Sequence, residues 1–263
     1  MAKDAAKKPR KADFKGAVKD AEAMGNTQTK TGDGFVQHIY ADYDTYKRIQ
    51  EDANKKKINA QYVKKSHIFF LADWLTEQGV AAGFGICHGV RRGKEQAWFN
   101  RRLDGAKVIG TDISETATQF PDTVQWDFHE ENPDWAGKAA FVYSNSWDHA
   151  YDPAKALQAW AKCLIPGGRL LLDHTPGHLP AATNALDPFG ATEAALVKLI
   201  NESLGAFGAV ETVLDRSDAE EYPCRVVVFK RAQATTKAAV EKPKAKAPAK
   251  PAAKGKSAKQ IVP

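Results

Sequence analysis

The chain has 263 residues, of which 43% are hydrophobic, and its net charge of +6 is concentrated at its two ends. Residues 1–30 carry a net charge of +4 and residues 232–263 a net charge of +7, so residues 31–231 sum to −5. A nucleic-acid-binding fold carries its basic residues within the domain, which argues against that class here. The three cysteines lie far apart in the sequence, which argues against a disulfide framework and against a structural metal site.

Residues 1–30 and 232–263 are predicted to be disordered tails. The first is a mixture of Lys, Ala, Asp and Gly, and the second repeats Lys, Ala and Pro. Such segments bury too little apolar surface to offset the entropy lost on ordering. The N-terminus has no apolar signal core and no run approaches 18 apolar residues, so we expect a cytoplasmic protein without a transmembrane segment.

Residues 31–78 are predicted to form a small helical region ahead of a sheet. Tyr40, Tyr43, Tyr46 and Ile49 recur at three-residue steps, a spacing that places them on one face of a helix. Two interpretations of these tyrosines stay open. They either pack in a core or form an aromatic lid over a substrate pocket.

Residues 79–231 alternate apolar runs with helical segments, which indicates a doubly wound parallel sheet. We predict helices at 94–103, 153–164 and 192–204, with a helical turn after residue 114, and strands at 81–87, 107–111, 123–126, 140–144, 168–173, 209–214 and 225–230. The loop 215–222 is too short for a parallel crossover. The expected fold is therefore α/β and Rossmann-like, with seven strands and an antiparallel last strand.

Five motifs in this segment indicate a nucleotide-cofactor site. The first strand runs into Gly89-Val-Arg91-Arg-Gly93, and the second strand ends at Asp112, about 20 residues after that turn. This order lets bare glycine backbone approach a cofactor while a carboxylate binds its ribose hydroxyls. The other three motifs are 124–129, 141–145 and 166–173.

The ordered motifs and the reversed last strand resemble class I S-adenosylmethionine-dependent methyltransferases, in particular the loose family whose first loop reads Gly-x-Arg-x-Gly. The resemblance covers residues 79–231 and implies S-adenosylmethionine as the cofactor. The chain departs from the family pattern in two places. Arg91 stands where a third glycine is usual, and Cys87 replaces the usual acid at the end of the first strand, which commonly engages the methionine ammonium group.

The resemblance assigns cofactor roles to several residues, each with a structural alternative. Arg91 presents a planar donor fork that matches the methionine carboxylate, or it is a solvated loop cation. Asp112 binds the ribose hydroxyls or caps the following turn. Asp127 binds the adenine amino group or is a turn residue. The other cofactor contacts expected are His88, Gly89, Gly93, Ile113, Phe128 and Ser144.

Catalytic groups are expected after the fourth strand, where Asp148 and His149 are adjacent. The pKa of an unperturbed histidine lies near neutrality, so His149 suits the role of general base beside Asp148. A capping or packing role is the alternative. Asp173 and His174, at the end of the fifth strand, are a second candidate pair.

The function implied is methyl transfer to a small-molecule, sugar or lipid-linked acceptor, with no metal. One alternative is a methyltransferase of RNA or another macromolecule. In that case the Lys-rich tails would grip the RNA or an acidic surface of the acceptor. Another is a non-catalytic module that has kept the fold. An NAD-dependent oxidoreductase is disfavoured, because the Gly-x-Gly-x-x-Gly fingerprint is absent.

Overall fold

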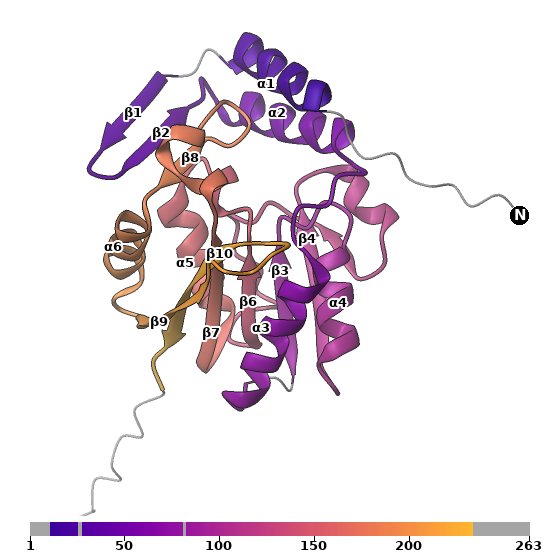
Figure 1. Cartoon of the computed structure of the whole chain (residues 1–263), viewed down its shortest axis with the longest axis vertical. Coiled ribbons are helices and arrows are strands. Elements are labelled where there is room, and N and C mark those ends of the chain that lie inside the picture. The colour runs from indigo at the N-terminus through magenta and orange to yellow at the C-terminus, as the bar shows by residue number, and fades with distance from the viewer. Residues whose placement is uncertain (1–10, 26–27, 81–82, 234–263) are drawn as a thin grey trace, which may run out of the picture. The chain divides into compact units, whose positions relative to one another are not determined.

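Seven strands form the central sheet of the computed structural model, which describes residues 11–25, 28–80 and 83–233 (Figure 1). They are β3 (Phe84–His88), β4 (Lys107–Asp112), β5 (Thr123–Gln125), β6 (Ala139–Ser144), β7 (Leu164–His174), β9 (Gly208–Arg216) and β10 (Cys224–Arg231). Their order is β5-β4-β3-β6-β7-β10-β9. Neighbours from β5 to β7 pair in parallel, whereas β10 is antiparallel to β7 and to β9. The predicted α/β sheet with an antiparallel last strand is confirmed.

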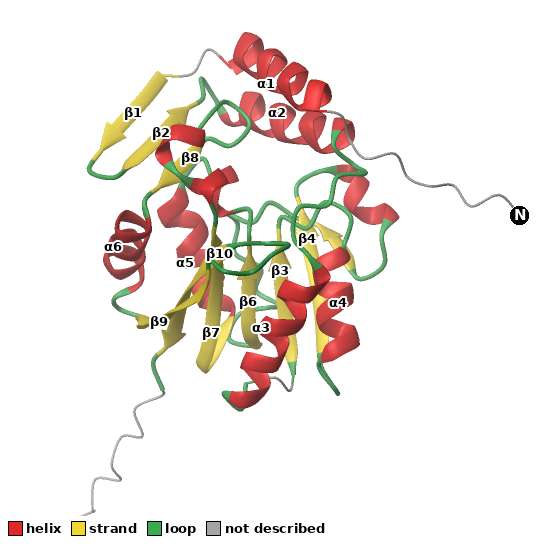
Figure 2. Ribbon diagram, in the orientation of Figure 1, coloured by secondary structure: helices red, strands yellow, loops and turns green. Residues whose placement is uncertain are grey.

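Helices cover both faces of this sheet (Figure 2). One face carries α3 (Lys65–Glu77) and α4 (Lys94–Arg102), and the other carries α5 (Pro153–Cys163) and α6 (Glu193–Leu204). Two cores result. Phe99 is fully buried in the first, and Trp160 is 1% exposed in the second. Asp152 starts α5 by accepting a hydrogen bond from the backbone of Lys155, as an N-cap aspartate does.

A smaller layer is formed mainly by residues that precede the central sheet in the sequence, joined by one strand that follows β7. Helix α1 (Lys11–Gly25) packs on α2 (Tyr43–Lys56), and β1 (Gln28–Gly32), β2 (Phe35–Ile39) and β8 (Phe189–Ala191) form a three-stranded antiparallel sheet. Figure 1 shows this layer at the end of the central sheet where the parallel strands terminate. Short 3-10 turns complete the chain: η1 (Glu115–Gln119), η2 (Trp147–His149), η3 (Pro176–His178) and η4 (Pro180–Ala182).

Two sequence predictions for this layer are wrong. Residues 11–25 are helical, not disordered, because Val18, Ala21 and Met24 recur at three-residue steps and join a cluster with Ile49 and Ala53 of α2. The region 31–78 is not purely helical, because an Asp-Gly turn at residues 33–34 folds residues 28–39 into a hairpin. The predicted C-terminal tail lies, from residue 234 onward, outside the described residues.

In the described ranges, no helix combines the length and the apolar character that a bilayer crossing requires.

Candidate functional site

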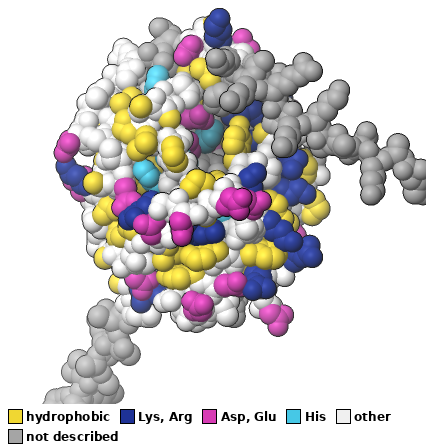
Figure 3. Space-filling view, viewed as in Figure 1, with side chains coloured by type: hydrophobic (Ala, Val, Ile, Leu, Met, Phe, Trp, Pro, Cys, Tyr) yellow, Lys and Arg dark blue, Asp and Glu magenta, His cyan; other side chains and the backbone are white. Residues whose placement is uncertain are grey.

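Two neighbouring cavities lie at the carboxyl ends of the parallel strands, where open α/β sheets bind ligands. The larger has a volume of about 450 Å³ and the smaller about 30 Å³. Both are lined by Gly89, Arg91, Ser146 and His149, so these four residues separate or border both cavities. Figure 3 shows histidine and acidic side chains together at the hollowed centre of this face.

The first loop has a left-handed backbone at the three fixed positions of its Gly-x-Arg-x-Gly motif. The φ angles are 72° at Gly89, 49° at Arg91 and 68° at Gly93. Glycine adopts this conformation without strain, and a side chain at Gly89 would place Cβ only 2.5 Å from Cβ of Ser146. The middle position therefore has the backbone that a third glycine would favour, although the residue is arginine.

Arg91 holds this strained backbone through its own side chain. Nε donates to Asn54 Oδ1 at 3.3 Å, and Nη1 donates to the carbonyls of Lys57 and Ala60 at 3.4 and 3.1 Å. The guanidinium group also lies 5.3 Å from the ring centre of Tyr62. Within the described residues, Nη2 makes no such hydrogen bond and is left for a ligand. Arg91 is thus an anchor between the loop and the end of α2.

Asp112 lies where the second strand of the motif series ends and is 4% exposed. Oδ2 accepts from the Arg91 amide at 2.8 Å, and Oδ1 accepts from the Ser114 amide at 3.0 Å and from Asn54 Nδ2 at 2.6 Å. Burial raises the pKa of Asp112, although these hydrogen bonds oppose the rise. The Asp112 carboxylate therefore accepts a hydrogen bond from the first loop, and with Ile113 it also lines the smaller cavity.

Asp127 follows β5 and lines the same cavity beside Phe128. Its Oδ1 accepts from Nδ1 of His129 at 2.7 Å, and its Oδ2 accepts from the Tyr43 hydroxyl at 2.8 Å. Burial alone would raise the pKa of Asp127, but the bonds from His129 outweigh burial and lower it.

Helix α2 closes the smaller cavity. Its Asn54 amide and Tyr43 hydroxyl donate to the two carboxylates that the sequence assigns to ribose and adenine. Amide and hydroxyl groups are the same kinds of donor as an adenine amino group and a ribose hydroxyl, so the chemistry of Asp112 and Asp127 fits a nucleoside. The smaller cavity, at about 30 Å³, has the volume of about one water molecule. The side chains of α2 must therefore move before a nucleoside can enter it. Tyr46 is 2% exposed and packs in the structure, whereas Tyr43 is 43% exposed and lines neither cavity, so the aromatic lid stays a prediction.

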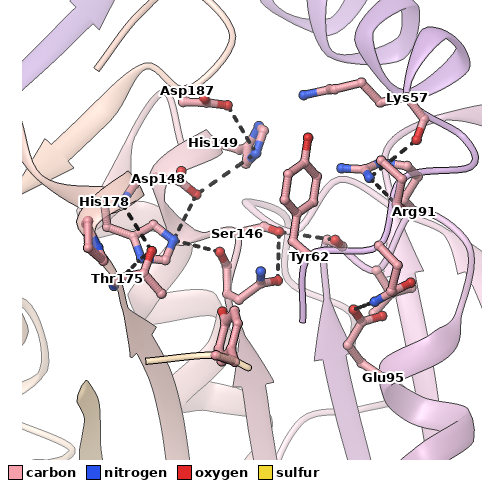
Figure 4. A pocket seen from close by; sticks show the side chains of 18 of the residues that line it. Lys57, Tyr62, Arg91, Glu95, Ser146, Asp148, His149, Thr175, His178 and Asp187 are labelled. Atoms are coloured by element: carbon pink, nitrogen blue, oxygen red, sulfur yellow. Dashed lines mark hydrogen bonds and ion pairs between the residues drawn. The ribbon is translucent and has the colours of Figure 1, made fainter. Parts of the chain in front are cut away.

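The larger cavity contains Asp148, His149 and Asp187 (Figure 4). Nδ1 of His149 hydrogen-bonds to Gln50 Oε1 at 2.9 Å, and Nε2 lies 3.4 Å from Asp187 Oδ1 and 4.0 Å from Asp148 Oδ1. Burial raises the pKa of Asp148 to about 7. Burial also acts to raise the pKa of Asp187, but His149 and Lys57 together hold it below its ordinary value. The predicted catalytic pair thus gains a second carboxylate.

His178 lies beside Asp148 as a neutral side chain. Its Nδ1 accepts from the Thr175 amide at 2.9 Å, and its Nε2 donates to the Asn145 carbonyl at 2.9 Å. Burial lowers the pKa of His178. The ring supports the loop after β7 and does not neutralise Asp148.

Three predicted cofactor contacts line neither cavity: His88, Gly93 and Ser144. Gly93 lies against the side chains of Gln96 and Thr123. The His88 ring is buried in the core, stacked on Trp160 with ring centres 5.0 Å apart, and burial lowers its pKa to about 3. The Ser144 hydroxyl donates to the His88 carbonyl at 3.2 Å and is fully buried. The side chains of His88 and Ser144 therefore pack in the core and support the ends of β3 and β6.

The second candidate pair is also turned away from the cavities. Asp173 is fully buried and accepts from Tyr143 at 2.6 Å, from Tyr222 at 3.1 Å and, at 2.9 Å, from His67. His174 Nε2 bonds to the Ala191 carbonyl at 2.8 Å. Neither residue lines the cavities, so the prediction that this pair is catalytic is corrected.

Several cavity residues had no sequence signal. Most come from segments outside the motif series: Gln50, Asn54, Lys57, His178 and Asp187. Glu95 lies just after the first loop, but no role was predicted for it. Only the spacing of the tyrosines pointed to α2. Nothing near residue 187 distinguishes its aspartate from any other loop acid.

No protein-family model and no curated protein matches the chain. Solved structures match its fold. The 1,6-didemethyltoxoflavin-N1-methyltransferase of Burkholderia thailandensis, solved with its acceptor and S-adenosylhomocysteine, aligns over 78% of this chain and all of its own, with a TM-score of 0.55 and 13% identity.

Two further methyltransferase structures are similar. The mitomycin 7-O-methyltransferase covers 71% of this chain and 59% of its own, with a TM-score of 0.54 and 17% identity. The N-methyltransferase NodS of Bradyrhizobium japonicum, in complex with S-adenosylhomocysteine, covers 69% and 98%, with a TM-score of 0.51 and 11% identity. At these identities the likeness defines the fold: the chain has the fold of class I S-adenosylmethionine-dependent methyltransferases.

Proposed function

We propose that the protein is an S-adenosylmethionine-dependent methyltransferase that acts on a small-molecule acceptor. The observation that carries this proposal is that the two cavities share four lining residues. The smaller is lined by the carboxylates Asp112 and Asp127, to which we assign the nucleoside, and the larger is lined by Asp148. The three similar structures are methyltransferases, and two were solved with S-adenosylhomocysteine, which supports the same cofactor.

The residues at the smaller cavity suit the nucleoside part of the cofactor. Asp112 accepts from the ribose hydroxyls and Asp127 accepts from the adenine amino group, while Ile113 and Phe128 pack on the base. Gly89 and Gly93 let the loop backbone approach. When bound, the cofactor supplies a methyl group on a positively charged sulfur.

Glu95 replaces the acid that is missing at Cys87. The Cys87 thiol is fully buried in the core, so it does not reach a ligand. Glu95, in the first turn of α4, lines the larger cavity and is 5% exposed. Its Oε1 accepts from Gln61 at 2.7 Å, whereas its Oε2 has no hydrogen-bond partner in the described structure. We assign the methionine ammonium group to this oxygen, and the methionine carboxylate to Arg91.

Asp148 and His149 are assigned to the acceptor. His149 lines both cavities and Asp148 lines the larger one, so a reacting atom of the acceptor in the larger cavity would meet the methyl group beside them. We propose that this pair promotes the loss of the acceptor's proton.

The test compares two ligands on one variant. Glu95→Gln keeps the shape of the side chain but removes its charge. We expect S-adenosylhomocysteine to bind about 10- to 100-fold more weakly, since a hydrogen bond to a charged group contributes about 1.5–3 kcal/mol.

5′-Methylthioadenosine has the nucleoside but no amino acid part, so its affinity should not change. Equal loss for both ligands would mean that Glu95 only supports the fold. Failure of the wild-type protein to bind either ligand would refute the proposed function.

A further inference from the structure

Three side chains in the larger cavity bring their acceptor atoms together. Asp148 and His149 belong to η2, and Asp187 lies in the loop before β8. One ligand atom from each lies within 4.8 Å of the other two. Figure 4 shows His149 between the two carboxylates, with all three side chains facing one another.

Gln50 determines which nitrogen of His149 is protonated. Gln50 Nε2 donates to the Leu186 carbonyl at 2.8 Å, so the amide oxygen is the atom that faces Nδ1 of His149 at 2.9 Å. An amide oxygen only accepts, and Nδ1 therefore donates. In the neutral imidazole, the lone pair is then on Nε2, beside the two carboxylates. Outer hydrogen bonds of this kind fix the tautomer of metal-binding histidines.

Asp148 contributes an oxygen that needs a positive partner. Its side chain is 10% exposed, and Oδ1 is buried without a hydrogen-bond partner in the part of the chain described. His178 Nε2 is 3.7 Å away but donates to the Asn145 carbonyl instead. Lys57 lines the same cavity and supplies one positive charge. A buried carboxylate oxygen without a partner is costly, and a bound cation would supply that partner.

We propose that Asp148, His149 and Asp187 bind a divalent cation, which in turn contacts the oxygen of a hydroxyl-bearing acceptor. One imidazole and two carboxylates suit Mn²⁺ or Zn²⁺, since Mg²⁺ and Ca²⁺ favour oxygen ligands alone. Bonds of about 2.0–2.2 Å place ligand atoms about 3–3.5 Å apart. The 3.4 Å separation fits this spacing, and the 4.0 Å separation closes with a small side-chain rotation.

This inference rests on the proposed methyltransferase function and specifies how Asp148 and His149 act on the acceptor. A divalent cation lowers the pKa of an oxygen ligand such as water or a hydroxyl group. The O–H bond of the acceptor then breaks, the proton passes to water, and the electron pair stays on the oxygen that accepts the methyl group. His149 is a ligand in this scheme and is not the base.

A second cluster of possible ligands is excluded by its hydrogen bonds. His67, Asp173 and Cys224 also lie close together. However, His67 Nδ1 faces a donor of Arg216 at 2.9 Å, and both oxygens of Asp173 accept hydrogen bonds. Each candidate ligand atom in that cluster already has a hydrogen-bond partner, so we interpret it as a structural network.

The test is Mn²⁺ binding to the full-length protein, measured from the loss of the electron paramagnetic resonance signal of free Mn²⁺. We expect one equivalent to bind to the wild type. Asp187→Asn and His149→Gln should each bind at least about 10-fold more weakly, the range found when the ligand environment of a metal is altered. The matched control is Asp215→Asn, a surface carboxylate paired with Arg225, and it should bind as the wild type does.

The outcomes separate this inference from the proposed function, because the measurement needs no cofactor. No binding at millimolar Mn²⁺, or equal binding by the wild type and by both cavity variants, would overturn the ion site. Thermal melts of each variant establish that it is folded. If Mn²⁺ binds but S-adenosylhomocysteine does not, the ion site stands and the methyltransferase assignment fails.

Discussion

Replacing Asn54 with alanine should tighten cofactor binding, although the residue lies in the cofactor half of the site. In the structure the Asn54 amide donates to Asp112 Oδ1 at 2.6 Å and accepts from Arg91 Nε at 3.3 Å. A ribose hydroxyl that takes this place on Asp112 must first displace the amide. Asn54→Ala removes the competitor and leaves the two backbone amides on Asp112 intact.

The magnitude follows from the net worth of one hydrogen bond. Such a bond contributes about 0.5–1.5 kcal/mol after exchange with water. The dissociation constant of S-adenosylhomocysteine should therefore fall by about 2- to 12-fold. Isothermal titration calorimetry measures this change directly.

The matched control is Lys55→Ala, one residue along the same helix. It breaks only an exposed ion pair with Glu115, and such pairs contribute about 0–1 kcal/mol to stability. It should bind the ligand as the wild type does. Unchanged or weaker binding by Asn54→Ala would refute the conclusion that α2 competes with the cofactor for Asp112.

Two further predictions concern the fold beneath the site. The Gly89→Ala variant should have a melting temperature several degrees below that of the Gly137→Ala variant. Both positions have positive φ, but only a Cβ at Gly89 meets Ser146. Such an overlap costs about 1–3 kcal/mol of stability. Equal melting temperatures would show that the loop relaxes. Burial lowers the pKa of His88 from 6.5 to about 3, so neutral His88 stabilises the fold above pH 6.5. That contribution is lost as the pH falls toward 3, at up to about 1.4 kcal/mol per pH unit. Urea unfolding of His88→Gln across this range should show a shallower loss than the wild type, and an identical slope would assign the titration to another group.

The central sheet could be predicted because its strands carry a strong local signal. Continuous apolar runs mark β3, β6 and β7, and the short segment 215–222 implies the reversed last strand. The hairpin of β1 and β2 lacked that signal, since β1 is polar and nearly all exposed. Its third strand, β8, comes from more than 140 residues away, and such pairing leaves no local pattern.

The site was predictable only where a motif fixes a strand end. Asp112 and Asp127 follow β4 and β5 directly, so the fold places them in the cavity. His88 also ends a strand, but its ring is directed into the core against Trp160. Asn54 and Asp187 come from α2 and from a distant loop, and only tertiary packing brings them to Asp112 and His149.

The most direct test of the central claim is calorimetric titration of the wild-type protein with S-adenosylhomocysteine, with NAD as the comparison ligand. We predict one micromolar site for S-adenosylhomocysteine and no binding of NAD. The reason is that we assign Asp112 and Asp127 to the nucleoside and the larger cavity beside them to the methyl acceptor. Absence of binding heat at millimolar S-adenosylhomocysteine, or saturable binding of NAD at the same site, would contradict this prediction.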